Sequence, residues 1–180
     1  MSKPIKPLER PAYGSIPHLS GSTLGPGDHH IHEGQERILT TKARDKHDTI
    51  IVTEKFDGSC VSVANVDGEI VPLTRSGHRA TDSFYAQHHD FDFWVMKCKP
   101  AWSFLRRGWR VCGEWMTTPH GTKYDTAPEF IPFDVIDDQN RRLAWVSADS
   151  ILPGFLYERR PDVLRCWPCA PADMHAEIGR

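Results

Sequence analysis

Apolar and polar residues begin to alternate in a regular way near residue 49. The run TIIVTEK, residues 49–55, predicts a buried strand, and CVSVANV, residues 60–66, alternates as a half-buried strand does. Asp67 and Gly68 form a tight-turn signal, and EIVPL, residues 69–73, follows as the return strand. The pattern therefore predicts an antiparallel hairpin.

Between Thr81 and Cys98 the period of the apolar positions becomes helical. The residues at these spacings are Phe84, Phe91, Trp94, Val95 and Cys98. Asp82 is a suitable cap for the start of this helix, and Pro100 ends it. One substantial helix is therefore expected after the hairpin.

Alternation returns in WRVCGEWM, residues 109–116, with the tryptophans on one face and Glu114 on the other. FIPFDVI at 130–136, a turn at DDQN, and RLAWV at 142–146 predict a further hairpin. Short antiparallel pairs with one long helix predict an α+β domain.

The regions outside this patterned stretch look irregular. The first 48 residues are rich in proline, glycine and polar runs, and they read as a loop-like arm. We therefore expect an arm at 1–48, a core at 49–150 and an irregular or divergent tail at 151–180.

Composition narrows the class of protein. The chain has 180 residues, 39% hydrophobic and 26% charged, which is ordinary for a globular domain with its own core. No apolar run approaches the roughly 18 residues of a membrane helix, and the N-terminus lacks the apolar core of a secretion signal. We therefore expect a cytoplasmic protein whose five cysteines are reduced thiols.

Net charge gives no general attraction to polynucleotides. The formal charge is −2, so any contact with nucleic acid must come from a local basic patch. Residues 97–110, KCKPAWSFLRRGWR, mix cations with aromatics and are the best candidate, although a helix end with a basic cap explains them equally well.

The stretch EKFDG, residues 54–58, contains a candidate nucleophile. A free lysine has a pKa of about 10.4, and burial or a neighbouring cation lowers it and exposes the lone pair. If the strand continues, Asp57 points to the same side as Lys55, where it can hold hydrated Mg²⁺ or a sugar hydroxyl. Gly58 would let a ligand approach the backbone closely. The competing interpretation is an exposed turn after a strand.

Four short segments occur in an order that resembles a known family. EKFDG, TRSG (residues 74–77), GEW (113–115) and FDV (133–135) are similar to successive motifs of the covalent nucleotidyltransferases, namely ATP-dependent RNA and DNA ligases and capping enzymes. The early YGSIPHLSGS, residues 13–22, is similar to the lead-in of small bacterial RNA-ligase-like proteins.

The resemblance implies a fold and an activity. The fold would be an α+β, adenylyltransferase-type (ATP-grasp-like) nucleotidyltransferase domain of antiparallel sheets with flanking helices. Lys55 would take AMP from ATP, with Mg²⁺ or Mn²⁺, and AMP would then activate a 5′-phosphate for sealing to a 3′-hydroxyl, as in RNA repair. The expected partners are ATP and RNA ends, or DNA ends, with no membrane, and the expected state is a monomer.

The resemblance also assigns roles to individual residues. Asp57 would contact the ribose or a metal-bound water, and Arg75 the ribose or a phosphate. Glu114 would hold the ribose or a metal, which makes it a predicted metal ligand together with Asp57. Phe133 would stack on the adenine, unless it is simply a core residue, and Glu54 would help to select the base. Gly58 would border the nucleotide.

The chain departs from the family in its C-terminal part. We find neither the glutamate-glycine pair nor the final lysine pair of the family's last motifs, and the last lysine is Lys123. Arg159 and Arg160 are candidates to replace these lysines. Cys60 stands where relatives commonly have arginine or asparagine. The alternative is thus a truncated, catalytically impaired relative that binds nucleotide or nucleic acid.

Two further clusters suggest metals or redox chemistry only weakly. His29, His30 and His32 lie close together, but we see no further ligand at a recognisable spacing, so a solvated loop is favoured. Cys166 and Cys169 form a C-x-x-C pair, which suggests redox chemistry or half of a zinc site.

Overall fold

The computed structural model describes residues 5–42, 44–45, 50–118, 124, 127–161 and 163–166. The chain forms two compact units, one made of Met1–Gly14 and Lys55–Pro161 and the other of Ser15–Glu54 and Asp162–Arg180. The expected division into arm, core and tail follows composition and stays a prediction. Each unit is described in turn.

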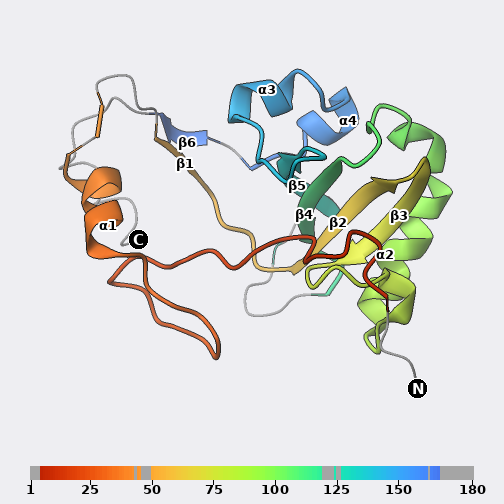
Figure 1. Cartoon of the computed structure of the whole chain (residues 1–180), viewed down its shortest axis with the longest axis horizontal. Coiled ribbons are helices and arrows are strands. Elements are labelled where there is room, and N and C mark those ends of the chain that lie inside the picture. Colours follow the sequence, from red (N-terminus) through yellow and green to blue (C-terminus); the bar gives the residue numbers. More distant parts are fainter. Residues whose placement is uncertain are drawn as a thin grey trace. The chain divides into compact units, whose positions relative to one another are not determined.

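The first unit contains a four-stranded antiparallel sheet in the order β3-β2-β4-β5 (Figure 1). Its strands are β2 (Ser59–Val66), β3 (Glu69–Thr74), β4 (Arg110–Trp115) and β5 (Phe130–Ile136). Asp67 and Gly68, between β2 and β3, both have positive φ, as a two-residue hairpin turn requires. The predicted hairpin and α+β class are confirmed.

One face of this sheet is covered by helix α2 (Ala86–Lys97) (Figure 1). Phe91 and Val95 of α2 are fully buried against Val61, Val63 and Val111 of the sheet. The core continues through η2 (Lys99–Trp102), whose Trp102 is fully buried, and through α3 (Trp145–Asp149) and α4 (Gly154–Tyr157), which contact β5. The apolar positions of the alternating strands thus face α2.

A β-bulge interrupts the pairing of β4 with β5. Cys112 pairs with Asp134 and Gly113 with Pro132, so Phe133 is the extra residue on β5. Phe130 and Val135 are five positions apart, yet both enter the core under α2, which strict alternation does not allow. The bulge therefore resets the alternation and re-aims the side chains of the FDV segment.

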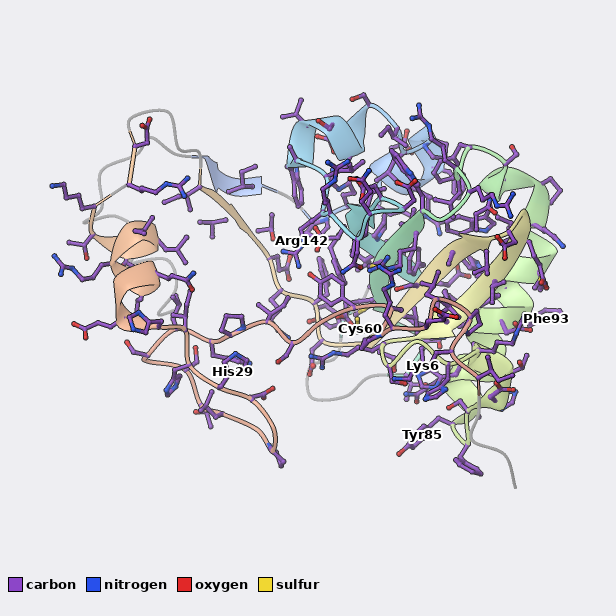
Figure 2. The ribbon with its side chains drawn as sticks, viewed as in Figure 1. Lys6, His29, Cys60, Tyr85, Phe93 and Arg142 are labelled. Carbon is purple, nitrogen blue, oxygen red and sulfur yellow. The ribbon has the colours of Figure 1, made fainter. Side chains whose placement is uncertain are left out.

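The predicted helix starts later than expected. A short 3₁₀ helix, η1 (Ala80–Asp82), comes first, so Asp82 ends that turn and does not cap α2. Phe84 is fully exposed, and Tyr85 and Phe93 also project from the surface of the unit (Figure 2). The helical spacing predicted a core position for Phe84 because this residue is apolar and fits the period. The period of apolar residues, however, does not reveal where a helix begins.

The prediction of a second strand at 142–146 is wrong. The DDQN turn is present, with Asn140 at positive φ and donating to the carbonyl of Asp137. After one isolated bridge between Arg142 and Ile136, however, the chain turns into helix α3, and Ala148 of α3 packs in the core. Tertiary packing overrides the short apolar pattern.

The second unit contains α1 (Glu33–Thr40) and a two-stranded antiparallel sheet of β1 (Ile51–Thr53) and β6 (Val163–Cys166). Helix α1 was not expected, because its sequence reads as a polar loop; His32 caps it by accepting the N–H of Gly34. The predicted strand at 49–55 is thus shorter than expected, and β6 lies in the expected irregular tail.

The weaker candidate sites can now be compared with the structure. No group of three or more metal-ligating side chains occurs among the described residues. In the histidine-rich segment, the ring of His30 contacts the carbonyl of Ser22. Cys169 lies outside the described residues, so the C-x-x-C hypothesis stays open. None of the described helices is both long and apolar enough to span a membrane.

We predict that Gly113→Ala destabilises the protein. A Cβ atom there would lie 2.5 Å from two ring carbons of Phe130 and 2.6 Å from the carbonyl oxygen of Ile131. Because these atoms belong to the packed core, the free energy of unfolding should fall by about 1–3 kcal/mol. The control is Gly154→Ala, where a Cβ would meet no atom within 4 Å apart from its chain neighbours and the backbone of its own helix. Denaturant unfolding of both variants checks this, and equal stabilities would contradict it.

Candidate functional site

Glu114 of β4 is at the centre of the candidate site. It pairs with Cys60 of β2, and one of its carboxylate oxygens, Oε2, is buried without a hydrogen-bond partner among the described residues. The backbone N–H of Gly58 donates to the carboxylate. A buried carboxylate oxygen left without a donor is costly, so it suggests a position that a ligand completes.

The charges around Glu114 show which side chains lie near it. Burial raises its pKa to about 7; the charges of Lys55 and Arg75 act to lower this pKa, and the charge of Asp57 acts to raise it. Charge interactions weaken with distance and with screening by water. The structure thus brings together one residue of GEW, one of TRSG and two of EKFDG.

Lys55 does not lie on a strand. Strand β1 ends at Thr53, and residues 54–57 have no regular structure, so the expected alternation does not carry Lys55 and Asp57 to one side. The Lys55 side chain is exposed, whereas we expected it to be partly buried. The backbone N–H of Asp57 donates to the Tyr124 hydroxyl at 3.0 Å. The ring of Tyr124 packs on that of Phe56, with 5.4 Å between the ring centroids.

Gly58 has a packing role that the sequence does not reveal. A Cβ atom at this position would lie 2.6 Å from the carbonyl oxygen of Trp115 and 2.8 Å from the sulfur of Met116. The absence of a side chain therefore lets the EKFDG segment approach the end of β4 closely. This contact brings the Gly58 N–H to Glu114.

Arg75 follows β3 and is exposed. Its carbonyl accepts the backbone N–H of Tyr13 at 3.1 Å, and its guanidinium donates to the carbonyl of Gly14 at 3.4 Å. Gly77 has φ of +90°, and a Cβ there would lie 2.2 Å from the carbonyl oxygen of Arg10. The TRSG turn is therefore packed directly on residues 10–14.

Phe133 lies on the same face of the sheet as Cys60. It is half-buried and packs in a small cluster with Tyr13, Cys60, Cys112 and Ile136. Part of the Phe133 ring therefore packs in this cluster, and part of it is exposed. Burial raises the pKa of the Cys60 thiol, so this thiol is neutral and contributes an apolar surface at this position.

Three other sequence candidates have different surroundings. Glu54 is exposed and belongs to the second unit. Arg160 is packed over the ring of Trp145, bonds to Asp149 and donates to the carbonyl of Phe133 at 3.3 Å. Arg159 pairs with Glu129 at 3.8 Å. The Arg160 guanidinium thus serves the packing of α3 against β5.

A hollow at the other end of β2 is not the candidate site. It has a volume of about 580 Å³ and lies beside the hairpin turn at Asp67. Its arginines already donate within the protein: Arg107 to Asp67, Arg110 to Ala12, and Arg10 to Leu8. The arginine side chains of this hollow are therefore engaged within the protein.

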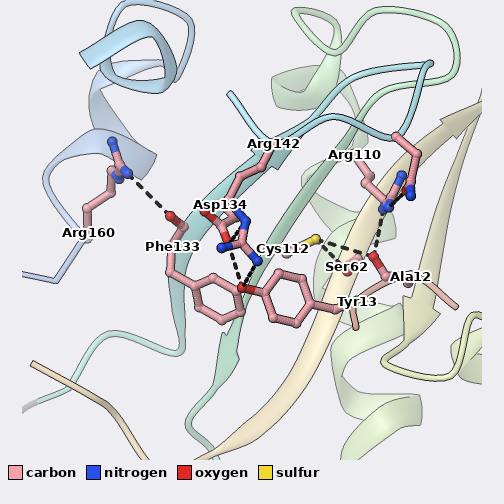
Figure 3. Close-up of polar contacts among 10 residues, drawn as sticks. Ala12, Tyr13, Ser62, Arg110, Cys112, Phe133, Asp134, Arg142 and Arg160 are labelled. Carbon is pink, nitrogen blue, oxygen red and sulfur yellow. Dashed lines mark hydrogen bonds and ion pairs between the residues drawn. The ribbon is translucent and has the colours of Figure 1, made fainter. Parts of the chain in front are cut away.

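Sequence reasoning missed a group of residues that supports this face. The Tyr13 hydroxyl donates to Asp134 at 2.5 Å and accepts from Arg142 at 2.8 Å, and Arg142 also pairs with Asp134 at 3.0 Å (Figure 3). The resemblance of the lead-in from residue 13 was the available signal for Tyr13. Nothing in the pattern indicated Arg142, because the residues that follow it were expected to continue a strand.

One protein-family model matches this chain. It is described as RNA ligase and matches residues 48–166. The search of curated proteins found no match.

Solved structures with the same fold include several of the Naegleria gruberi RNA ligase. A variant with AMP and Mn has a TM-score of 0.59 and 20% identity, covering 78% of this chain and 44% of that chain. A second variant, with ATP and Mn, has a TM-score of 0.58 and 18% identity, covering 79% and 44%. The ligase with pyrophosphate has a TM-score of 0.55 and 18% identity, covering 73% and 41%. The chain thus spans less than half the length of these proteins.

We predict that Glu114 makes the stability depend on pH. Its pKa is about 7 in the folded protein, above the ordinary value of about 4.3, so between these pH values the folded state keeps a proton that the unfolded chain has released. Raising the pH through this window therefore lowers the free energy of unfolding. Glu114→Gln removes this effect. From pH 5 to pH 8 the free energy of unfolding of the unmodified protein should therefore fall by on the order of 2 kcal/mol more than that of the variant.

Unfolding in denaturant at several pH values tests this. The same change at Glu69, an exposed glutamate of β3, controls for the loss of one charge. A stability difference between Glu114→Gln and the unmodified protein that stays constant from pH 5 to pH 8 would contradict the prediction.

Proposed function

Because the chain belongs to the RNA ligase family, we propose that it is an ATP-dependent RNA-ligase-type nucleotidyltransferase that forms a lysyl-AMP intermediate on Lys55. The observation that carries this proposal is that the charges of Lys55, Asp57 and Arg75 all act on the pKa of Glu114, whose carboxylate is partly buried. Lysine, acidic and arginine side chains in one place suit the attack of an amine on a phosphate.

In the first step Lys55 is the nucleophile. Its ammonium group loses a proton to water, and the nitrogen attacks the α-phosphorus of ATP. The new N–P bond forms as the bond from the α-phosphorus to the bridging oxygen breaks, and pyrophosphate leaves. The exposed side chain of Lys55 gives this amine free access to a nucleotide.

Other residues would bind and orient the nucleotide. Arg75 offers a planar set of donors for a phosphate or a ribose hydroxyl. Phe133 presents a half-exposed aromatic ring to the adenine, because an aromatic face stacks on a purine. Gly58 would border the nucleotide, and Glu54 would help to select the base. These roles follow the order of the family's motifs in this chain.

Asp57 and Glu114 fit a divalent cation. Oε2 of Glu114 has no hydrogen-bond partner among the described residues, and the charge of Asp57 acts on the pKa of this carboxylate. Carboxylate oxygens are the ligands that Mg²⁺ and Mn²⁺ prefer. Among the described residues, Asp57 and Glu114 would hold such an ion, and one or two carboxylates together with substrate phosphates usually suffice for Mg²⁺. When bound, it would offset negative charge on the phosphates.

The later steps would seal a polynucleotide. An oxygen of a 5′-phosphate attacks the phosphorus of lysyl-AMP, the N–P bond breaks, and Lys55 takes up a proton. A 3′-hydroxyl then attacks the activated 5′-phosphate, AMP leaves, and the hydroxyl proton passes to water. RNA is the proposed substrate class because the family and the similar structures are RNA ligases, with DNA ends as the alternative and a monomer as the working form.

A second candidate is a nucleotide-binding relative that does not transfer AMP. It is favoured by Arg160, whose guanidinium serves packing against Trp145 and Asp149 and so does not replace the family's final lysines. Removing a preorganised cation from a transferring phosphate typically costs orders of magnitude in rate. Covalent labelling separates the two candidates.

We predict that ATP labelled at the α-phosphate leaves its label on the protein. Lys55→Ala should abolish the label, because the N–P bond needs this amine. Lys97→Ala, at an exposed lysine in the last turn of α2, is the control and should keep it. Mass spectrometry should show one added AMP group on Lys55. Nucleotide binding with no covalent label would instead support the second candidate.

We predict that labelling needs a divalent cation. With EDTA in excess the label should fall by at least about tenfold, because neutralising the phosphates stabilises the charge that develops in transfer. Mg²⁺ or Mn²⁺ added back should restore it. Labelling that is unaffected by EDTA would remove the metal role of Asp57 and Glu114.

A further inference from the structure

Tyr13 connects two separate parts of the candidate site. Its backbone N–H donates to the carbonyl of Arg75 at 3.1 Å, and its ring meets that of Phe133 edge-on, with 5.0 Å between centroids and 69° between planes. Arg75 follows β3, and Phe133 is the bulge residue of β5, at the other edge of the sheet. A residue of the N-terminal segment thus contacts both.

The polar end of Tyr13 is held in one orientation. Its hydroxyl donates to Asp134 and accepts from Arg142, whose guanidinium also lies 5.3 Å from the centre of the Tyr13 ring (Figure 3). Tyr13 is only 6% exposed. Burial, followed by the charge of Asp134, raises the pKa of this hydroxyl, so it keeps the proton that it donates.

The bulge explains why Phe133 and Asp134 reach the same tyrosine. In a regular strand neighbouring side chains point to opposite faces, but a bulge re-aims one of them. Tyr13 contacts Phe133 through its ring and Asp134 through its hydroxyl. The bulge therefore lets one buried tyrosine contact both residues, and the packed ring is the part that supports Phe133.

We propose that Tyr13 is a positioning residue that holds Phe133 and Arg75 in the geometry that binds the nucleotide. This inference rests on the proposed function for the roles of Phe133 and Arg75. Tyr13 acts through these residues and is not assigned a contact with the nucleotide. Edge-to-face aromatic packing restricts the tilt of the Phe133 ring, and stacking on a base depends on that tilt.

The experiment measures the Kd of the unmodified 180-residue chain and its variants for AMP by titration calorimetry. AMP has no pyrophosphate to lose, so its binding is separate from the transfer reaction. Tyr13→Met fills a similar volume without a rigid ring and should raise the Kd by about five- to tenfold, as expected for a weakened base stack. Tyr13→Leu serves the same purpose if Tyr13→Met does not fold.

Two comparisons separate positioning from stability. Tyr13→Phe keeps the ring and should keep the Kd within about twofold, although it loses the buried hydroxyl bonds and should lower the Tm. Leu8→Ala loosens the same segment, since Leu8 packs on Ala12 and Leu73 away from Phe133, and it should also leave the Kd within about twofold. In a Phe133→Leu background, Tyr13→Met should add little further loss.

The outcomes are distinct. An unchanged Kd in Tyr13→Met, an equal loss in Leu8→Ala, or an unmodified protein that does not bind AMP would each overturn the positioning role. If AMP binding depends on Tyr13 but ATP leaves no label on Lys55, the positioning role stands and the proposed transferase activity fails.

Discussion

Strands β2 and β4 pair antiparallel from Ser59 opposite Trp115 to Ala64 opposite Arg110, and the candidate site depends on this pairing. It places Cys60 opposite Glu114, so the segment that leads into β2 arrives beside the end of β4. Lys55 and Asp57 reach Glu114 for this reason, although neither lies on a strand. A shift of one residue would turn Glu114 into the core and move Val111 out of it.

The same pairing explains the glycines of the motif segments. Gly113 leaves room for the Phe130 ring within the core, and Gly58 leaves room for the carbonyl of Trp115 at the strand end. Both glycines permit close approach between packed elements. Glycine in these segments therefore serves the sheet as well as any ligand, and the packing role alone would account for its presence.

At the candidate site one carboxylate oxygen of Glu114 has no hydrogen-bond partner among the described residues, whereas three side chains of the same unit bond to one another. The Glu114 carboxylate is buried and raised in pKa, whereas Tyr13, Asp134 and Arg142 satisfy one another nearby. A group that is costly to leave unpaired is tolerated when its neighbours hold it in place. This contrast is typical of a binding site that a charged ligand or cation completes, and it agrees with the RNA ligase family.

The sequence by itself determined strands β2 to β5 in their order along the chain, the β2–β3 hairpin and the four motif segments, because these depend on local alternation and turn residues. It also identified Lys55, Asp57, Arg75 and Glu114 as candidates through their resemblance to a family. It did not reveal the start of α2, helix α1 or the helical state of α3, since short apolar or polar runs have no distinct period.

Only the tertiary structure decided which candidates meet. The bulge at Phe133 arises from the pairing of β4 with β5, and the Tyr13 hydroxyl bonds to Asp134, 121 residues further along the chain; no local pattern records such contacts. The exposure of Lys55 and the packing of Arg160 against Trp145 were decided in the same way. The physical reason is that burial and pairing depend on which distant elements pack together, whereas alternation along a chain reports only on the element itself.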